Sequence, residues 1–310
     1  GFAADPHTYG RSWFPCFDNF TERSTYDFEI KTQGTHKAFC NGLLLNEIAN
    51  IDGTKTWVWH LNQQIPTYLA NVAVANYATV NQKYTKTNGT QIPIQLGARA
   101  VDTTALKGSF VNLNNALLSY ETRFGPYLFD RVGYAVTSFN AGAMEHATNI
   151  TYMAGAVNGN TQMETLMAHE LSHHWFGNNT TCETAEDMWL NEGWATYTNA
   201  IARELVKPRQ DCLDFLIESR SRTIRNNGGS VYAYDTANVS DLFEGDMRYR
   251  KGSMVLHQLR WEIGDSAFFA GTRNYLEDAE LCYGFAKTID FQQAMENASG
   301  QDLEGFFDRY

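Results

Sequence analysis

The chain of 310 residues is acidic, with 24 Lys and Arg residues against 35 Asp and Glu residues and a formal net charge of −11. This balance lacks the basic stripe of a nucleic-acid-binding protein, so the sequence excludes nucleic acid as an expected partner. Its 43% hydrophobic content suffices for one large or two moderate cores, yet its most apolar stretch, residues 68–77, is far shorter than the roughly 20 residues of a membrane span, which predicts a chain without a transmembrane segment.

Residues 25–100 show the alternation of apolar and polar positions that is typical of antiparallel strands, as in 26–30 (YDFEI) and 56–60 (TWVWH). Turn sequences separate these runs, and they lie at Gly34, Asn41-Gly42, Asp52-Gly53 and Asn88-Gly89. We therefore expect a β domain over residues 1–100, built as a β-sandwich or an open β-layer.

The pattern changes after residue 100. Apolar residues spaced by three and four predict a helix over Ala105–Phe124, and short strands are expected over Val132–Phe139 and Ala147–Tyr152. Further helices are predicted over Met163–Phe176, Met188–Val206, Asp211–Arg225 and Arg248–Ile263. The sequence thus predicts an α+β protein with a second domain over residues 101–310.

The segment His169-Glu170-Leu171-Ser172-His173 fits the pattern H-E-x-x-H within a predicted helix. Two histidines four residues apart share one helical face, with Cβ atoms about 5–6 Å apart, so both can bind one Zn²⁺ ion. A catalytic zinc needs a third protein ligand and an open position, and Glu192, at the start of the next predicted helix, is the candidate. The sequence therefore predicts one zinc ion bound by His169, His173 and Glu192.

The neighbouring residues have other expected roles. His174 points about 100° around the helix from His173, which predicts a packing or surface residue. Asp187 is a candidate to orient a ligand histidine through its free ring N–H. A structural zinc site usually has four Cys or His ligands, whereas two histidines and a carboxylate beside Glu170 predict a catalytic site with an open position. The five cysteines are widely spaced, and they are Cys16, Cys40, Cys182, Cys212 and Cys282.

With Glu192 inside W-L-N-E-G, these motifs resemble those of the M1 family of zinc aminopeptidases, the gluzincins that include aminopeptidase N and leukotriene A4 hydrolase. Residues 142–146 (GAMEH) look like the family's exopeptidase motif G-A-M-E-N, and residues 249–252 (YRKG) look like the segment that carries its catalytic tyrosine. Residues 11–18 (RSWFPCFD) are similar to a stretch of its N-terminal β domain.

The resemblance implies the later part of a saddle-like β domain followed by a thermolysin-like catalytic domain, in a fragment that lacks the family's helical C-terminal domain. It also implies an enzyme that removes N-terminal residues from peptide substrates, with Glu170 as general base and Tyr249 as donor to the oxyanion. Glu145 would bind the substrate ammonium, next to Gly142, Ala143 and Met144 on a strand at the edge of a sheet.

Two positions depart from the family pattern. His146 replaces the asparagine of the exopeptidase motif, and a second amine-binding residue would fall near Ala4 and Asp5, where alanine cannot bind an amine. Two alternatives therefore stay open: a zinc endopeptidase or peptidase of relaxed specificity, and a metal-containing binding protein without turnover. Glu170 and Tyr249 argue against the second alternative, because a non-catalytic metal site needs neither.

The composition also bears on location. Low Lys content with abundant Asn, Thr, Tyr and Trp favours a secreted or cell-envelope protein, while a cytoplasmic location stays open. Asn-x-Ser/Thr triplets, the acceptor sequence for N-glycosylation, include those that begin at Asn19, Asn88, Asn149 and Asn238. The sequence predicts no particular oligomeric state.

Overall fold

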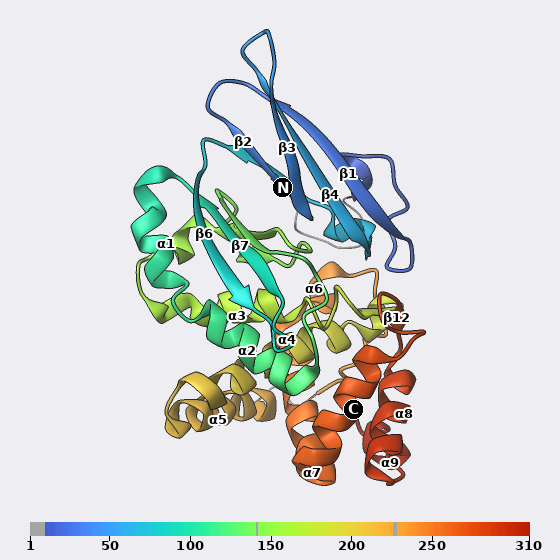
Figure 1. The fold of residues 1–310 in the computed structure, drawn as a ribbon. Coiled ribbons are helices and arrows are strands. Elements are labelled where there is room, and N and C mark those ends of the chain that lie inside the picture. Colours follow the sequence, from blue (N-terminus) through green and yellow to red (C-terminus); the bar gives the residue numbers. More distant parts are fainter. Residues whose placement is uncertain (1–9, 141, 226–227) are drawn as a thin grey trace. The chain divides into compact units, whose positions relative to one another are not determined.

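The computed structural model describes residues 10–140, 142–225 and 228–310, which form two compact units (Figure 1). The first unit runs up to Asn114 and resumes over Tyr127–His174, and the second comprises Asn115–Pro126 and Trp175–Tyr310. Strands predominate in the first unit and helices in the second, so the α+β class is confirmed. These units are defined by the contacts between residues, and their bounds differ from those of the expected domains 1–100 and 101–310. The expected domains stay a prediction.

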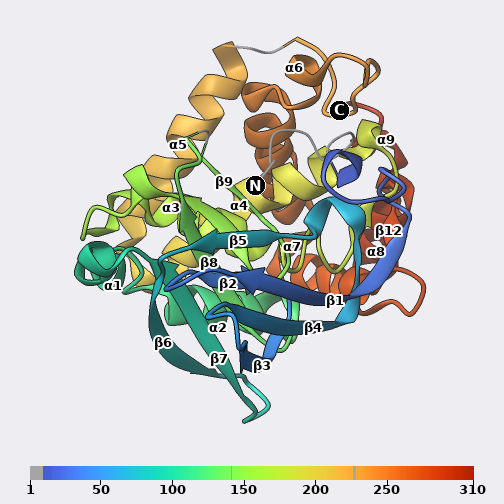
Figure 2. The ribbon, with the colours of Figure 1, turned by 90° about the horizontal axis from the view of Figure 1, so that it is seen from above.

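The N-terminal part of the first unit contains a three-stranded antiparallel sheet of order β1-β4-β3 and an antiparallel pair, β2-β5 (Figure 2). The strand bounds are β1 (Arg23–Thr32), β2 (Lys37–Cys40), β3 (Leu43–Ala49), β4 (Lys55–Pro66) and β5 (Val72–Ala75). An aromatic core that includes Phe39, Trp57 and Trp59 holds the strands together, and the Trp59 indole donates a hydrogen bond to the Ala38 carbonyl (3.1 Å). The expected antiparallel β region is confirmed.

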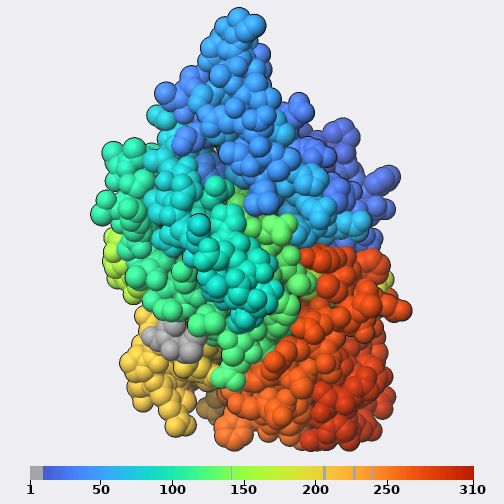
Figure 3. Space-filling view, viewed as in Figure 1, coloured from blue at the N-terminus to red at the C-terminus, as the bar shows by residue number. Residues whose placement is uncertain are grey.

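The glycines of the expected turns, Gly34, Gly42, Gly53 and Gly89, all have positive φ. Gly42 shows a second requirement, because a Cβ atom there would lie 1.9 Å from the carbonyl oxygen of His60. Only glycine permits both the left-handed conformation and this close approach. In Figure 3 the turn between β3 and β4 projects from the first unit as a narrow blue tip.

A five-stranded mixed sheet of order β6-β7-β8-β10-β9 forms the rest of the first unit's β structure. The bounds are β6 (Ala78–Thr85), β7 (Gln91–Ala98), β8 (Val132–Thr137), β9 (Ala143–Met144) and β10 (Ile150–Met153). β8 pairs in parallel with β7 and β10, while β6 and β9 are antiparallel edge strands. Strands from both sides of residue 100 thus share one sheet, and β9 lies at its edge as the sequence predicted for this segment.

The single helix predicted over Ala105–Phe124 is wrong, because the structure has two helices, α1 (Thr103–Ser109) and α2 (Leu113–Phe124). The hydroxyl of Ser109, the last residue of α1, accepts a hydrogen bond from the backbone N–H of Gly159 (3.0 Å). This contact with a distant loop fixes the end of α1. The spacing of apolar residues continues through the break, so periodicity alone does not detect it.

The helix that carries the H-E-x-x-H motif, α3 (Glu164–Ser172), is shorter than the predicted Met163–Phe176. Short 3₁₀-helices also occur in the described part of the chain, at Gly10–Ser12, Thr67–Leu69, Ala100–Asp102, Ala154–Ala156, Thr161–Met163 and Ala185–Asp187. Helix α3 follows one of these directly.

The second unit is mainly helical, and α7 and α8 lie side by side in it (Figure 1). Its helices are α4 (Trp189–Val206), α5 (Arg209–Arg225), α6 (Val239–Leu242), α7 (Gly252–Glu277), α8 (Thr288–Ser299) and α9 (Glu304–Phe307), with a parallel strand pair, β11 (Thr181–Cys182) and β12 (Phe285–Ala286). The helices predicted over 188–206 and 211–225 are confirmed.

The helix predicted over Arg248–Ile263 is partly wrong. Its first residues belong to a π-helix, Gly245–Lys251, and α7 begins only at Gly252. The predicted end is close to a real interruption, because Gly264 has φ 80° and ψ 160° within α7. A wider turn with i→i+5 hydrogen bonds has no distinctive spacing of apolar residues over so few positions, so sequence periodicity missed it.

Candidate active site

The two motif histidines lie at the end of α3, His169 half-buried and His173 fully buried. Their Nε2 atoms are 3.3 Å apart, and the rings are nearly perpendicular at 84°. Two nitrogen ligands at about 2.0–2.1 Å from one tetrahedral zinc ion would be separated by roughly 3.3–3.4 Å. This separation fits a shared metal ion, and the role of the two histidines as its ligands stays a prediction.

Two tyrosines of the five-stranded sheet hold α3 in place. Tyr134 of β8 donates from its hydroxyl to the carbonyl oxygen of Met167 (2.8 Å), and Tyr152 of β10 donates to that of Met163 (3.2 Å). Both rings are buried, and they contact each other edge to face. The sheet thus positions the histidine-bearing helix through hydrogen bonds at fixed points, a role of these two tyrosines that the sequence did not predict.

Two carboxylates lie close to the histidines in the same unit. Glu170 of α3 and Glu145, the residue after β9, are both buried, and their carboxylate oxygens and a ring nitrogen of His173 all lie within 4.8 Å of one another. Two carboxylates this close favour a cation between them, because like charges at short range disfavour each other's ionised form. The structure thus brings Glu170 and Glu145 together beside His173, and the roles expected of the two carboxylates stay a prediction.

The strand before Glu145 offers an edge to an extended peptide. Ala143 and Met144 pair with Tyr152 and Thr151 of β10, and the carbonyl of Gly142 accepts a hydrogen bond from Met153 N–H (3.1 Å). β9 is the last strand of its sheet, so the backbone groups on its other side face no further strand of that sheet. Strand addition at such an edge is a common mode of peptide binding.

His174 has a specific role that its sequence position did not reveal. Its Nε2 accepts a hydrogen bond from the backbone N–H of Thr148 (2.9 Å), while Nδ1 donates to the Leu171 carbonyl (3.1 Å). Burial lowers the pKa of His174 to about 3, so the ring stays neutral and keeps this tautomer. The expected packing role is confirmed, and the residue also ties the end of α3 to the loop that follows Glu145.

His146 lies in this loop and is also buried, and its Nδ1 lies 3.1 Å from the hydroxyl of Thr151. Burial lowers its pKa from 6.5 to about 3. The unfolded chain therefore takes up a proton below about pH 6.5 that the folded protein refuses, and stability is lost as pH falls from there towards 3.

We expect His146→Gln to reduce this acid sensitivity. Between about pH 6.5 and pH 5 the free energy of unfolding of the wild type should fall by about 2 kcal/mol more than that of the variant. Urea unfolding at the two pH values measures the difference. Parallel losses in the two proteins would contradict the buried neutral state of His146.

Glu192, the predicted third ligand, lies in the first turn of α4 in the second unit and is buried. The turn is fixed from both sides, because the Asn191 side chain accepts a hydrogen bond from Cys182 N–H (3.1 Å) and the Trp189 indole donates to the Thr288 hydroxyl (2.8 Å). Asp187, expected to orient a ligand histidine, accepts two hydrogen bonds from Thr288, one from its hydroxyl (2.6 Å) and one from its N–H (3.2 Å). Its orienting role stays a prediction.

Tyr249 lies in the π-helix of the second unit and is half-buried. Arg248 and Lys251 tie this π-helix to the backbone carbonyls of Ser230 and Gly229. The second amine-binding position expected near Ala4 and Asp5 lies outside the described residues.

The second unit also contains a pocket of about 580 Å³ between α4, α5 and α7. Glu204 in its lining lies on α4 twelve residues after Glu192, which places it about 18 Å further along the helix. Among the described residues that line it, none is a predicted site residue. We therefore assign no substrate binding to this pocket.

Family models match both parts of the chain: the peptidase M1 N-terminal domain over residues 5–69 and the peptidase family M1 domain over residues 111–310. A glutamyl aminopeptidase from Bitis rhinoceros is 29% identical over 336 aligned residues, which cover 99% of this chain and 34% of the relative. An aminopeptidase N from Lactococcus lactis subsp. lactis is 26% identical, over 97% of this chain and 37% of the relative. The chain spans about a third of the length of these curated relatives.

An M1 zinc metallopeptidase from Deinococcus radiodurans has a similar fold, with a TM-score of 0.82 at 22% identity, over 98% of this chain and 67% of that one. The expected order of a β-rich N-terminal part and an M1 catalytic domain is thereby confirmed. Since the M1 domain alone matches residues 111–310, well over half of the sequence, this chain belongs to peptidase family M1.

Proposed function

We propose that this protein is a zinc-dependent aminopeptidase, which removes N-terminal residues from peptides. One observation carries the proposal: the Nε2 atoms of His169 and His173 are 3.3 Å apart, and Glu170 and Glu145 lie beside them in a buried cluster. Two ring nitrogens that could bind one metal ion and two carboxylates thus lie in one small region. Membership of a peptidase family supports the same activity.

The zinc ion would be held by His169, His173 and Glu192, the ligand set that the sequence predicts. Two imidazoles and one carboxylate make a common donor set for catalytic zinc, which leaves one position open. When bound, zinc lowers the pKa of a water molecule towards about 7 and polarises a carbonyl group. Glu192 is buried on a turn that hydrogen bonds hold in place, and a preformed carboxylate of this kind favours metal binding.

Glu170 would accept the proton of the attacking water and pass it to the leaving amine. Its place on the same helix as the histidines supports this role, since one helical turn fixes base and ligands together. The Tyr249 hydroxyl would donate a hydrogen bond to the carbonyl oxygen as negative charge develops there.

The substrate would bind along β9, with its backbone paired to the edge formed by Gly142, Ala143 and Met144. Glu145 follows this strand directly, so its carboxylate would meet the α-ammonium group at the end of the peptide. A charge-assisted hydrogen bond in a buried position contributes about 1.5–3 kcal/mol. The substrate's free N-terminus would thus be recognised by its charge.

The Glu145 carboxylate provides the test against the endopeptidase alternative. We expect wild-type protein to cleave peptides with a free N-terminus at least roughly ten-fold better than N-acetylated ones, and Glu145→Ala to narrow this ratio chiefly by slowing the free-amine reaction. The ratio of kcat/KM for matched fluorogenic peptides measures it. Glu29→Ala, which removes an exposed carboxylate of β1, should leave the ratio unchanged.

Efficient internal cleavage of acetylated peptides that Glu145→Ala leaves intact would favour an endopeptidase. Zinc binding without turnover of either peptide class would favour a binding protein instead. The ratio between substrates is informative even when overall activity is low, because both peptides meet the same metal site.

We further propose a secreted or cell-envelope location. Asn19, Asn88 and Asn238 are exposed, as acceptors of glycans must be, whereas Asn149 is buried and donates a hydrogen bond to the Phe39 carbonyl (3.1 Å). Among the described residues, none of the five cysteines takes part in a disulfide and no helix is long and apolar enough to cross a membrane. Fractionation of producing cells tests the proposal, and recovery in the cytosol alone would contradict it.

A further inference from the structure

Helices α4 and α7 meet at two glycines. A Cβ atom on Gly193 would lie 3.0 Å from the Cα atom and 3.1 Å from the carbonyl carbon of Gly252, and one on Gly252 would lie 3.0 Å from the Cα atom of Gly193. These neighbours are backbone atoms, which cannot swing aside as a flexible side chain does. Gly252 has ordinary helical angles (φ −53°, ψ −47°), and alanine is the better helix former, so the need at this point is for space.

The two glycines stand next to the proposed catalytic groups of the second unit. Gly193 directly follows Glu192 on α4, and Gly252 follows Tyr249 by three residues at the start of α7. A Cβ atom on Gly193 would also lie 3.2 Å from the carbonyl oxygen of Arg248. The backbone of α4 beside the ligand thus rests directly on the turn that carries the tyrosine.

Hydrogen bonds fix that turn independently of α4. The Glu244 side chain accepts a bond from Met247 N–H (2.6 Å) at the start of the π-helix. Arg248 donates to the Ser230 carbonyl (2.7 Å), and Lys251 donates to that of Gly229. The π-helix is therefore a defined structure, and its position against α4 depends on how closely the two glycines approach.

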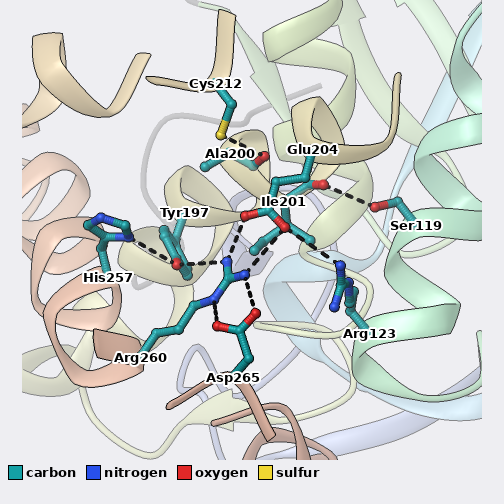
Figure 4. Close-up of polar contacts among 10 residues, drawn as sticks. All are labelled: Ser119, Arg123, Tyr197, Ala200, Ile201, Glu204, Cys212, His257, Arg260 and Asp265. Carbon is teal, nitrogen blue, oxygen red and sulfur yellow. Dashed lines mark hydrogen bonds and ion pairs between the residues drawn. The ribbon is translucent and has the colours of Figure 1, made fainter. Parts of the chain in front are cut away.

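A second contact joins the same two helices further along (Figure 4). Arg260 of α7 donates to Glu204 of α4 (2.7 Å) and to Asp265 (2.8 Å), and it also contacts the hydroxyl of Tyr197 (3.3 Å), which lies 3.2 Å from a ring nitrogen of His257. Although burial alone would lower the pKa of Arg260, its bonds to Asp265 and Glu204 raise it. This remote contact stabilises the helix pair without involving Glu192 or Tyr249.

We propose that the contact between Gly193 and Gly252 is a positioning device for the proposed peptidase reaction: it sets the distance between the carboxylate of Glu192 and the hydroxyl of Tyr249. The inference rests on the proposed function. A methyl group at either position makes the backbone of the π-helix give way from α4 by a few tenths of an ångström, and this shift moves the Tyr249 hydroxyl from the oxygen on which charge develops. Displacements near 1 Å in catalytic groups can lower rates by about 10²-fold.

The test compares Gly193→Ala and Gly252→Ala with two controls. Each should lower kcat by roughly 3- to 10-fold, with KM and zinc content close to the wild-type values. Gly305→Ala adds a methyl group to a helical glycine of α9 with no atom within 4 Å, and it should leave kcat unchanged. Arg260→Met removes the remote contact, so it should lower Tm while kcat at low temperature stays near normal.

A double-mutant comparison separates positioning from general damage. In a Tyr249→Phe background, Gly252→Ala should cost little further activity, because the donor that it misplaces is already gone. An equal loss in both backgrounds would overturn the proposal, as would full kcat in both single alanine variants. If neither alanine variant folds, Lys251→Met takes their place, since it loosens the π-helix at its bond to Gly229, and full activity in that variant would also overturn it.

Failure of the positioning proposal can be told apart from failure of the proposed aminopeptidase function. A wild-type protein that binds zinc but cleaves no peptide contradicts the aminopeptidase proposal before any glycine is changed. An active wild type with insensitive glycine variants contradicts the positioning device alone.

Discussion

Glu170→Gln is expected to lower kcat by on the order of 10²-fold or more while the protein keeps about one zinc ion per chain. The reason is that an amide has nearly the shape of a carboxylate but cannot accept the proton of the attacking water. Glu170 is buried on α3 between the two histidines in sequence, so the change removes the base and leaves both ligands in place. Turnover of a free-amine fluorogenic peptide and elemental analysis of the same sample measure the two quantities.

Glu192→Gln is the paired variant, and it should weaken zinc binding because a carboxylate ligand is lost. Glu164→Gln, at the start of α3, is the matched control, since it changes a carboxylate of the same helix away from the histidines. Equal zinc loss in Glu170→Gln and Glu192→Gln would show that ligand and base have been assigned wrongly. A wild type that contains no transition metal, and that added Zn²⁺ neither binds nor stabilises, would contradict the zinc site altogether.

The histidine pair was predictable because its geometry is local. His169 and His173 are four residues apart, and residues at that spacing share one face of any helix. The 3.3 Å between their Nε2 atoms therefore depends on little beyond α3 itself. The position of Glu145 beside Glu170, in contrast, is not set by local geometry. It depends on the pairing of β9 with β10 and on the placement of α3 by Tyr134, so only the family resemblance had suggested it.

Contacts between distant segments determine the features that the sequence did not predict. The break between α1 and α2 is fixed by Ser109 and Gly159, fifty residues apart in the chain, and no local pattern records it. Asn149 fits a glycosylation triplet, yet its side chain lies in a buried hydrogen-bond network with Asn71. The change in pattern near residue 100 is real, but β7 and β8 continue one sheet across it. Periodicity describes which face is buried and not which partner covers it.

Tyr249→Phe should lower kcat by roughly 10²-fold and leave zinc content and KM almost unchanged. The variant removes one hydroxyl and keeps the ring, so the half-buried side chain retains its packing within the π-helix. A hydrogen bond to an oxygen that becomes charged only during the reaction stabilises the transition state more than the bound substrate. The loss should therefore fall on kcat.

The affinity of inhibitors distinguishes a loss of oxyanion stabilisation in Tyr249→Phe from a general disturbance of the site. A phosphinic peptide carries a charged oxygen where the oxyanion develops, so its affinity should fall by roughly the same factor as kcat in Tyr249→Phe, whereas the affinity for a product-like free amino acid should not change. Tyr234→Phe, which alters an exposed tyrosine of the same unit, is the matched control and should change neither quantity. Near-normal turnover in Tyr249→Phe, or equal loss of affinity for both ligands, would return Tyr249 to the residues that serve packing alone.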